Sequence, residues 1–173
     1  MQYYMMYRAE IGTGSQSKES LFLAAVCQPE SFFCIIENTD QKAPIGYLGI
    51  KDTSKDRWEI AIELDRQYTH RGYGSQSIKL FLNKLFYTTG KTQYRTTIDA
   101  DNIPSQKCFE GLGANLVGLS SSEFLVTPED QHRFEERHLD LINDHIRNTA
   151  ARLSLEPRKL LSHVLEYHII CPL

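Results

Sequence analysis

Residues 68–77 read YTHRGYGSQS, and two glycines, Gly72 and Gly74, lie one residue apart in this stretch. A run typical of a β-strand precedes them, and a run typical of a helix follows. Glycine lacks a Cβ atom, so the backbone here can pass close to a ligand. The first turn of the helix presents unpaired N–H groups and a partial positive charge, and Arg71 adds a cation. The stretch therefore predicts a loop that binds a phosphate or diphosphate.

The spacing of the glycines excludes two common phosphate-binding loops. A P-loop needs Gly-x4-Gly-Lys-Ser/Thr, which the sequence lacks, and a dinucleotide-binding loop needs a third glycine where Ser77 stands. A tight strand-to-helix turn without any ligand also fits Gly-x-Gly. The short motif alone leaves a binding loop and a purely structural turn both open.

The composition of the chain is that of an ordinary globular protein. It has 173 residues, of which 41% are hydrophobic and 24% are charged, so we expect one domain, with or without an appendage. A net charge of −3 argues against a nucleic-acid partner. The four cysteines lack the close pairing of a zinc site, and we expect no metal. Free thiols and the lack of a long apolar run or signal peptide predict a cytoplasmic protein without a membrane partner.

Hydrophobic periodicity predicts an α/β fold with a mixed sheet and helices on its faces. The run 56–65 alternates cleanly, with Trp58, Ile60 and Ile62 on one face and Glu59 and Glu63 on the other. The short polar turn before it predicts an antiparallel hairpin with the preceding strand. We expect strands within 1–10, 31–40, 43–53, 56–65 and 93–102, helices over 19–30, 75–90 and 103–114, and two short strands within 115–127.

From Thr127 onward the pattern becomes helical. Thr127 is a predicted N-cap, with a proline at the first helical position and two acidic residues after it. We expect a second helix to begin near Ser154 and to continue through Leu165. The sequence therefore predicts a domain over 1–127 and a helical C-terminal extension over 128–173.

The block EIAIELDRQYTHRGYGSQSIKLFL, residues 59–82, resembles the acetyl-CoA-binding segment of the GNAT superfamily of N-acetyltransferases. In that family a strand leads into a loop of the form Gln/Arg-x-x-Gly-x-Gly/Ala and then into a helix. Gly72 and Gly74 fall on the two small positions, and Thr69 takes the place of the Gln or Arg. The stretch is similar in form to the subgroup that acetylates ribosomal-protein N-termini and polyamines.

A second block, DADNIPSQKCFEGLGA at residues 99–114, resembles a later motif of the same family. Asn102, Ser105, Phe109 and Gly113 fall on its characteristic positions. One departure is Phe109, which stands where the family commonly has a tyrosine. The two blocks occur in the family's order and at its separation. The resemblance implies the GNAT acyl-CoA N-acyltransferase fold, with a mostly antiparallel central sheet flanked by helices.

The resemblance also implies how acetyl-CoA, the co-substrate, would be held. Main-chain groups of Ile62, Glu63 and Leu64 would pair with the pantetheine arm, and Asn102 and Ser105 would contact that arm from the other side. Asn102 also fits an N-cap of the short helix. The backbone amides that would surround the diphosphate belong to His70, Arg71, Gly72, Tyr73, Gly74 and Ser75.

Two carboxylates are candidates for the catalytic base. Glu59 and Glu63 lie on the same face of one predicted strand, and either could accept a proton from the attacking amine through a water. The resemblance favours Glu59, which stands where related enzymes often have the base. Both could equally be solvated residues of a half-exposed strand. For the acid we expect Ser105, because Phe109 has no proton to donate, with Cys108 as a less favoured choice. A thiolate leaving group could also depart without an acid.

The resulting hypothesis is an N-acetyltransferase that transfers an acetyl group from acetyl-CoA to a primary amine. The acceptor would be a small molecule or a protein or peptide N-terminus, and an apolar stripe on the late helices leaves a homodimer open. Two alternatives come from other classes. Phe109 and Thr69 allow a non-catalytic acyl-CoA-binding regulatory module, and the helical tail allows an interaction domain whose glycine turn is purely structural.

Overall fold

The computed structural model describes residues 29–173 of the chain. The strand expected within the first ten residues, and all but the last two residues of the helix expected over 19–30, lie outside this range. The described residues contain a six-stranded sheet with helices, which confirms the predicted α/β fold class. None of the helices in the described range is long and apolar enough to cross a membrane.

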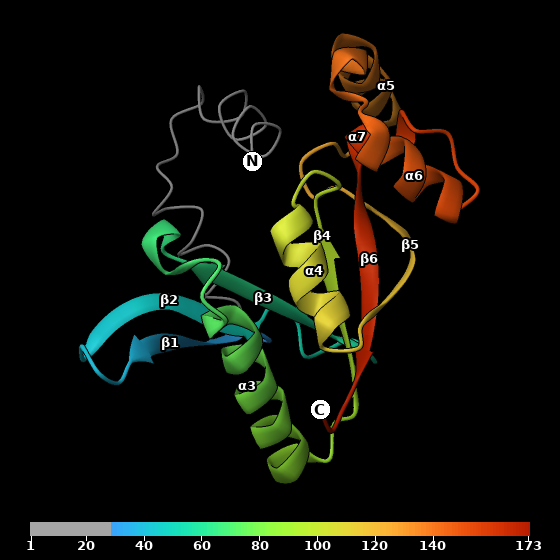
Figure 1. Cartoon of the computed structure of the whole chain (residues 1–173). Helices are drawn as coiled ribbons and strands as arrows, with labels where there is room; N and C mark the ends of the chain where they lie inside the picture. Colours follow the sequence, from blue (N-terminus) through green and yellow to red (C-terminus); the bar gives the residue numbers. More distant parts are fainter. Residues whose placement is uncertain (1–28) are drawn as a thin grey trace. The chain divides into compact units, whose positions relative to one another are not determined.

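The sheet is mixed, and its strands follow the order β1-β2-β3-β4-β6-β5 (Figure 1). β1 pairs antiparallel with β2, β2 pairs antiparallel with β3, and β3 pairs parallel with β4. The polar segment 51–57 closes the predicted hairpin between β2 and β3. The strands are β1 Phe32–Asn38, β2 Ala43–Ile50, β3 Trp58–Leu64, β4 Gln93–Ile98, β5 Asn115–Ser121 and β6 His163–Ile170.

The chain divides into two compact units, which we describe separately. The first, here called the glycine-loop unit, comprises the described residues within 15–96, 107–115 and 168–173. The second, here called the helical unit, comprises those within 97–106 and 116–167. The predicted domain boundary between 127 and 128 stays a prediction.

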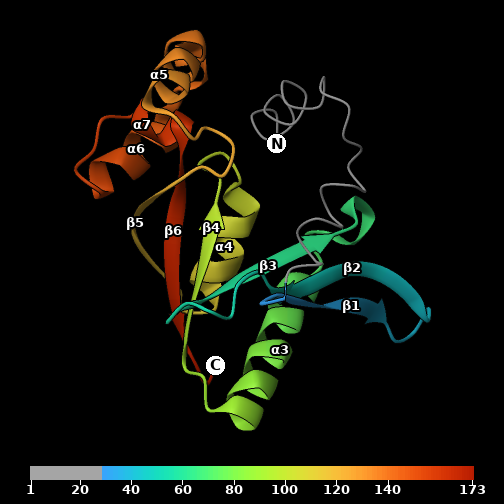
Figure 2. The same cartoon turned by 180° about the vertical axis from the view of Figure 1, so that it is seen from behind.

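The long helix α3, Tyr73–Thr89, belongs to the glycine-loop unit and lies against one face of β1, β2 and β3 (Figures 1 and 2). Ile78 and Leu82 are fully buried on its inner face. The centroid of the Phe81 ring lies 5.8 Å from that of the Phe32 ring of β1. Gly90 ends the helix in a left-handed conformation, and its N–H donates to the Phe86 carbonyl. The helix and its C-terminal cap are both as the sequence predicts.

The C-terminal end of the chain belongs to the glycine-loop unit. The Cys171 N–H donates to the Thr92 carbonyl at 2.8 Å. The Asn83 side chain of α3 exchanges two hydrogen bonds with the backbone of Leu173. Residues separated by 90 positions in the sequence are thereby held together beside α3.

The helical unit contains three helices after residue 127: α5 Pro128–Arg137, α6 Asp144–Arg152 and α7 Lys159–Ser162. Thr127 caps α5 as predicted, because its Oγ1 accepts a hydrogen bond from the Asp130 N–H at 3.1 Å. A 3-10 turn, Leu139–Leu141, follows α5. Asn143 then caps α6 through the Ile146 N–H.

A buried carboxylate joins α5 to α7. Glu135 is almost fully buried and accepts hydrogen bonds from Ser162 Oγ at 2.6 Å and Lys159 Nζ at 3.0 Å. Desolvation acts to raise the pKa of Glu135, but the hydrogen bonds from Ser162 and Lys159, with the charges of Lys159 and Arg158, outweigh it and lower this pKa. The carboxylate is therefore compensated, as a buried charge must be.

The helix expected from Ser154 through Leu165 is wrong except for the four residues of α7, Lys159–Ser162. α7 ends at Ser162, and residues 163–170 form strand β6, which lies between β4 and β5 in the sheet. Alternate residues Leu165, Tyr167 and Ile169 are fully buried, a period of two that specifies a strand. Because the run is rich in apolar residues, it also matches helical spacing, and the sequence alone does not single out the alternation.

The segment 115–127 also differs from expectation. It forms one strand, β5, which ends at Ser121, rather than two short strands. The Phe124 N–H donates to Ser122 Oγ, a local turn that competes with continued strand pairing.

Candidate active site

The predicted diphosphate loop joins β3 to α3 in the glycine-loop unit. A short 3-10 turn, Arg66–Tyr68, leads into it, and both His70 (φ +60°) and Gly72 (φ +82°) adopt left-handed conformations. A Cβ on Gly72 would meet no atom within 4 Å, so the backbone angle, rather than crowding, is what calls for glycine there. His70 adopts such an angle without being glycine, which costs about 1 kcal/mol.

The N-terminus of α3 suits an anion. Gly72 is its N-cap and offers no side chain to accept from the first amides, and the first turn contains no acidic residue. The intrahelical bonds begin with the Gln76 N–H, which donates to the Gly72 carbonyl at 3.0 Å. The preceding amides and the positive end of the helix dipole are left to other partners. A diphosphate supplies the charge and the acceptor oxygens that this terminus lacks.

The loop is packed against the end of β3. A Cβ on Gly74 would lie 3.6 Å from the Leu64 side chain and 3.6 Å from Cys108 Sγ, so an alanine there would make ordinary contacts with both. Ser75 Oγ lies 3.2 Å from Cys108 Sγ, within hydrogen-bonding distance for sulfur. The strand end, the loop and α4 (Ile103–Gly111) therefore meet at the first turn of α3.

The end of β3 pairs with β2 in the described part of the chain. β2 pairs with it throughout, with Leu48 opposite Ile62, Tyr47 opposite Glu63 and Gly46 opposite Leu64. Pairing with β4 covers only two residue pairs of the described chain, the last of them Glu59 with Arg95. Within the described residues the β3–β4 pairing therefore stops before Ile62, and the pairing of Ile62–Leu64 with the pantetheine arm stays a prediction.

The two candidate bases lie in different surroundings. Glu59 is 6% exposed. Its Oε1 pairs with Lys51 Nζ at 3.1 Å, and its Oε2 accepts from Arg95 Nη2 at 2.5 Å. Glu59 therefore ties the ends of β2, β3 and β4 together. Glu63 is exposed, and its Oε2 accepts a hydrogen bond from the Tyr47 hydroxyl at 2.7 Å.

The other predicted site residues are divided between the two units. Asn102 and Ser105 belong to the helical unit, where Asn102 Oδ1 accepts from the Ser105 N–H at 3.3 Å and so caps α4. Phe109 belongs to the glycine-loop unit and is 1% exposed, a core residue. The catalytic role of Ser105 and the pantetheine contacts of both residues stay predictions.

Sequence reasoning missed two side chains at this site. Tyr47 faces Glu63 only because the β2–β3 register places them opposite each other, and a hairpin with a seven-residue connection leaves that register open. Asn38 lies at the end of β1, and its Nδ2 donates to the Tyr73 hydroxyl at 3.0 Å. Nothing local in the sequence links Asn38 to the glycine loop.

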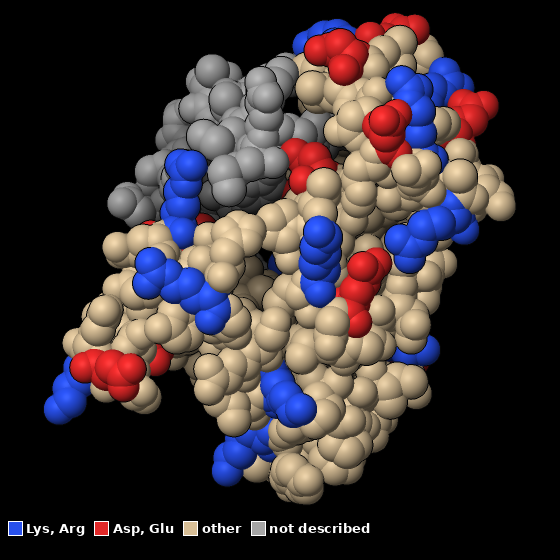
Figure 3. Space-filling model, viewed as in Figure 1, with Lys and Arg blue, Asp and Glu red and all other residues tan. Residues whose placement is uncertain are grey.

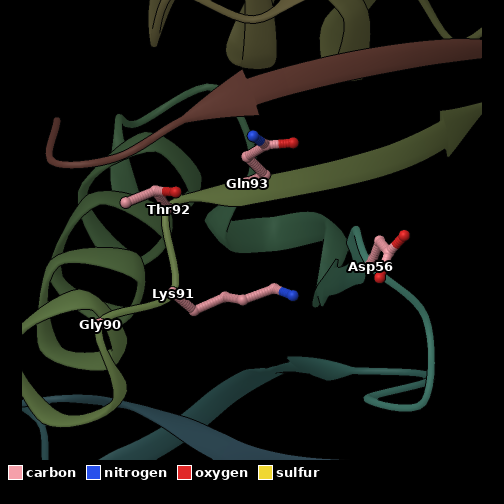
Figure 4. A pocket seen from close by; sticks show the side chains of 5 residues that line it. All are labelled: Asp56, Gly90, Lys91, Thr92 and Gln93. Carbon is pink, nitrogen blue, oxygen red and sulfur yellow. The ribbon is translucent and has the colours of Figure 1, made fainter.

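A pocket of about 390 Å³ lies at the opposite end of α3 (Figure 4). The pocket is lined by Asp56, which precedes β3, and by residues between the end of α3 and the start of β4: Gly90, Lys91, Thr92 and Gln93. α3 has 17 residues, so about 25 Å of helix separates this pocket from the glycine loop. The pocket is therefore distinct from the candidate active site.

The charges on the surface are mixed. Lys and Arg side chains on the face shown in Figure 3 are scattered among acidic ones and do not merge into a basic stripe. Within residues 29–173, no group of three or more His, Cys, Asp or Glu side chains is arranged to hold a metal ion.

Comparison with known proteins gives a family and a fold. Residues 2–115 match the family model described as "Acetyltransferase (GNAT) domain". No curated protein matches the chain as a sequence relative.

Among solved structures, one similar fold is spermidine N-acetyltransferase from Vibrio cholerae in complex with CoA and spermine. It has a TM-score of 0.58 and 13% identity, with 90% of this chain and 76% of that chain covered. Another is the ribosomal-protein-S5-alanine acetyltransferase from Vibrio fischeri. Its TM-score is 0.56 at 12% identity, with 97% and 84% covered. At these identities the likeness shows a shared fold.

Proposed function

The chain belongs to the GNAT acetyltransferase family, and from this premise we propose that it transfers an acetyl group from acetyl-CoA to a primary amine. The observation that carries the proposal is the N-terminus of α3, which begins at a left-handed glycine and has neither a side-chain cap nor an acidic first turn. This arrangement supports a diphosphate held by the amides of residues 70–75. The β3–β4 pairing covers Trp58 and Glu59 in the described residues, and we place the pantetheine arm further along β3, at Ile62–Leu64.

The reaction is direct acyl transfer. The neutral amine nitrogen attacks the thioester carbonyl carbon, a C–N bond forms, the C–S bond breaks, and coenzyme A leaves as a thiolate. The amine loses two protons along the path, one before attack and one from the tetrahedral intermediate. One of them ends on the thiolate and the other passes to solvent. An amine with a pKa near 10 is largely protonated at neutral pH, so a group that accepts its first proton accelerates the reaction.

Glu63 is the better placed of the two predicted bases. Its side chain is exposed near the end of β3, where an acceptor amine could approach, and Tyr47 orients one of its oxygens. Both oxygens of Glu59 are engaged by cations, which suits a structural ion pair. We propose Glu63 as the proton acceptor, acting directly or through a water, and Glu59 as the residue that fixes the strand ends. Ser105 remains the proposed acid.

The acceptor is proposed only as a class. One similar structure contains spermine and another is an acetyltransferase of a ribosomal protein, so a small-molecule amine and a protein N-terminus are both candidates. An exposed carboxylate near the reacting carbonyl favours a cationic amine. A cytoplasmic location and a homodimer stay predictions. The three cysteines within the described residues are free thiols, which is compatible with a reducing compartment.

A thiol-release assay with acetyl-CoA over a panel of polyamines and N-terminal peptides tests the proposal. We expect release with at least one amine class, and Glu63→Gln should lower kcat about 100-fold, the usual contribution of a positioned base. Glu110→Gln, the same change at an exposed position on α4, should leave kcat within about twofold.

Two results would contradict this account. Binding of acetyl-CoA without thiol release for any amine would instead support the non-catalytic binding module. The second result would be a fully active Glu63→Gln together with a folded but inactive Glu59→Gln. It would make Glu59 the proton acceptor and Glu63 dispensable for proton transfer.

A further inference from the structure

The turn between β1 and β2 is tied to the glycine loop by a hydrogen bond that neither segment predicts alone. Asn38, the last residue of β1, is 6% exposed, and its Nδ2 donates to the hydroxyl of Tyr73 at 3.0 Å. Tyr73 is the first residue of α3 and lies between Gly72 and Gly74. The contact joins positions 35 residues apart.

The orientation of the Asn38 amide is fixed by its surroundings. Its Oδ1 accepts from the N–H groups of Asp40 and Gln41, both at 3.0 Å. Two backbone donors can only face the carbonyl oxygen, so the amide nitrogen must face Tyr73. The Tyr73 oxygen is therefore the acceptor in this bond, and a phenylalanine there would leave a buried donor unsatisfied.

A second contact joins the same two segments but is exposed. The Tyr68 hydroxyl donates to Gln41 Oε1 at 3.0 Å, and the Tyr68 ring meets the Tyr73 ring edge-on with centroids 6.2 Å apart. A solvent-exposed bond of this kind contributes little, because water replaces either partner readily. The half-buried bond to Tyr73 is thus the stronger of the two tethers.

The position of this tether matters because it lies at the first turn of α3, where the proposed diphosphate site begins. Gly72 has no side chain, and the N-terminus of α3 has no side-chain cap. The next residue is Tyr73. Its hydroxyl ties the start of α3 to Asn38 of the sheet, beside the contacts of Gly74 with Leu64 and of Ser75 with Cys108. A small rotation at Gly72 would turn the amides of residues 73–75 away from a bound anion.

We propose that Asn38 is a positioning residue that acts through Tyr73, fixing the first turn of α3 in the conformation that binds the cofactor diphosphate. The inference rests on the proposed function, since it assigns a role in acetyl-CoA binding. In this proposal the β1–β2 turn positions the cofactor site indirectly and makes no contact with the cofactor.

The test is calorimetric titration of the full chain with acetyl-CoA, combined with steady-state kinetics. Tyr73→Phe should raise the Kd and the KM for acetyl-CoA about threefold to tenfold, the factor expected for one hydrogen bond. The KM for the amine and kcat should stay within about twofold, a split that general destabilisation would not produce. Asn38→Ala should act in the same direction. The double variant should raise Kd no further than the larger single change, because both remove the same bond.

Tyr68→Phe is the matched control, since it makes the same chemical change in the same turn at an exposed bond. It should leave the Kd within about twofold. An unchanged Kd in folded Tyr73→Phe, or additive effects in the double variant, would overturn the inference. Failure of the wild-type protein to bind acetyl-CoA at all would refute the proposed function itself, so the two failures are distinguishable.

Discussion

Gly72 and Gly90 mark the two ends of α3 and share one backbone requirement. Their φ angles are +82° and +74°, and a Cβ on either would meet no atom within 4 Å. Each is therefore glycine for conformational reasons alone, and an alanine at either position carries the same strain. They differ in their neighbours, because Gly72 belongs to the proposed diphosphate loop and Gly90 to the distant helix end.

This pair separates stability from binding. Gly72→Ala and Gly90→Ala should each lower the free energy of unfolding by about 1 kcal/mol. Only Gly72→Ala should weaken acetyl-CoA binding, by about tenfold or more, because the loop amides would be displaced. Denaturant unfolding and calorimetric titration measure the two quantities. Equal effects of both variants on affinity would show that the loop has no special part in binding.

Single residues also set the limit of what the sequence could predict at the site. The glycine loop was predictable, because Gly72 and Gly74 lie between a strand and a helix and the family motif shares that spacing. The contact between Tyr47 and Glu63 was not, since it depends on strand register. The ion pairs that distinguish Glu59 from Glu63 require three strands to be aligned, and alternation alone makes the two residues equivalent.

Among the elements, β6 shows how a helical expectation fails. The run from Leu160 to Ile170 is so apolar that matches to helical spacing occur by chance. In the structure, residues 163–170 form a strand between two others, and tertiary pairing outweighs local preference. By contrast, α3 and α5 were predictable, because Gly90 and Thr127 mark their ends with specific capping chemistry.

Two adjacent isoleucines test the assignment of β6. Ile169 is 1% exposed and Ile170 is 69% exposed, as alternation in a strand requires. Ile169→Ala should cost about 2–5 kcal/mol of unfolding free energy through the cavity it leaves, whereas Ile170→Ala should cost less than about 0.5 kcal/mol. Denaturant unfolding of the two variants gives the comparison. Similar costs would mean that the two side chains do not point to opposite faces.

For the molecule as a whole, stability at alkaline pH depends on two buried groups in the glycine-loop unit. Burial, with a smaller contribution from nearby Cys171, raises the pKa of Tyr94 to about 12. Burial likewise raises the pKa of the Cys171 thiol to about 11. Both groups are neutral when protonated, so the folded state favours the protonated form. Their contribution to stability is complete below the unfolded-state pKa values and is lost as pH rises through the folded-state values.

We therefore expect the unfolding midpoint in denaturant to fall as pH rises from about 9 to 11, where the unfolded thiol ionises first. Cys171→Ser, which does not ionise in this range, should be less stable near neutral pH but should show a smaller decline. Cys34→Ser is the control, because it makes the same change at an exposed cysteine. Identical pH slopes for the two serine variants would contradict the assignment.

The central claim is that the amides at the start of α3 hold the diphosphate of acetyl-CoA, and amide chemical shifts test it most directly. In a ¹H–¹⁵N titration of the full chain with acetyl-CoA, the account predicts the largest shifts at residues 70–75, with the amide of Gly90 unaffected. Shifts concentrated elsewhere in the presence of saturable binding, or no shifts at all, would contradict it.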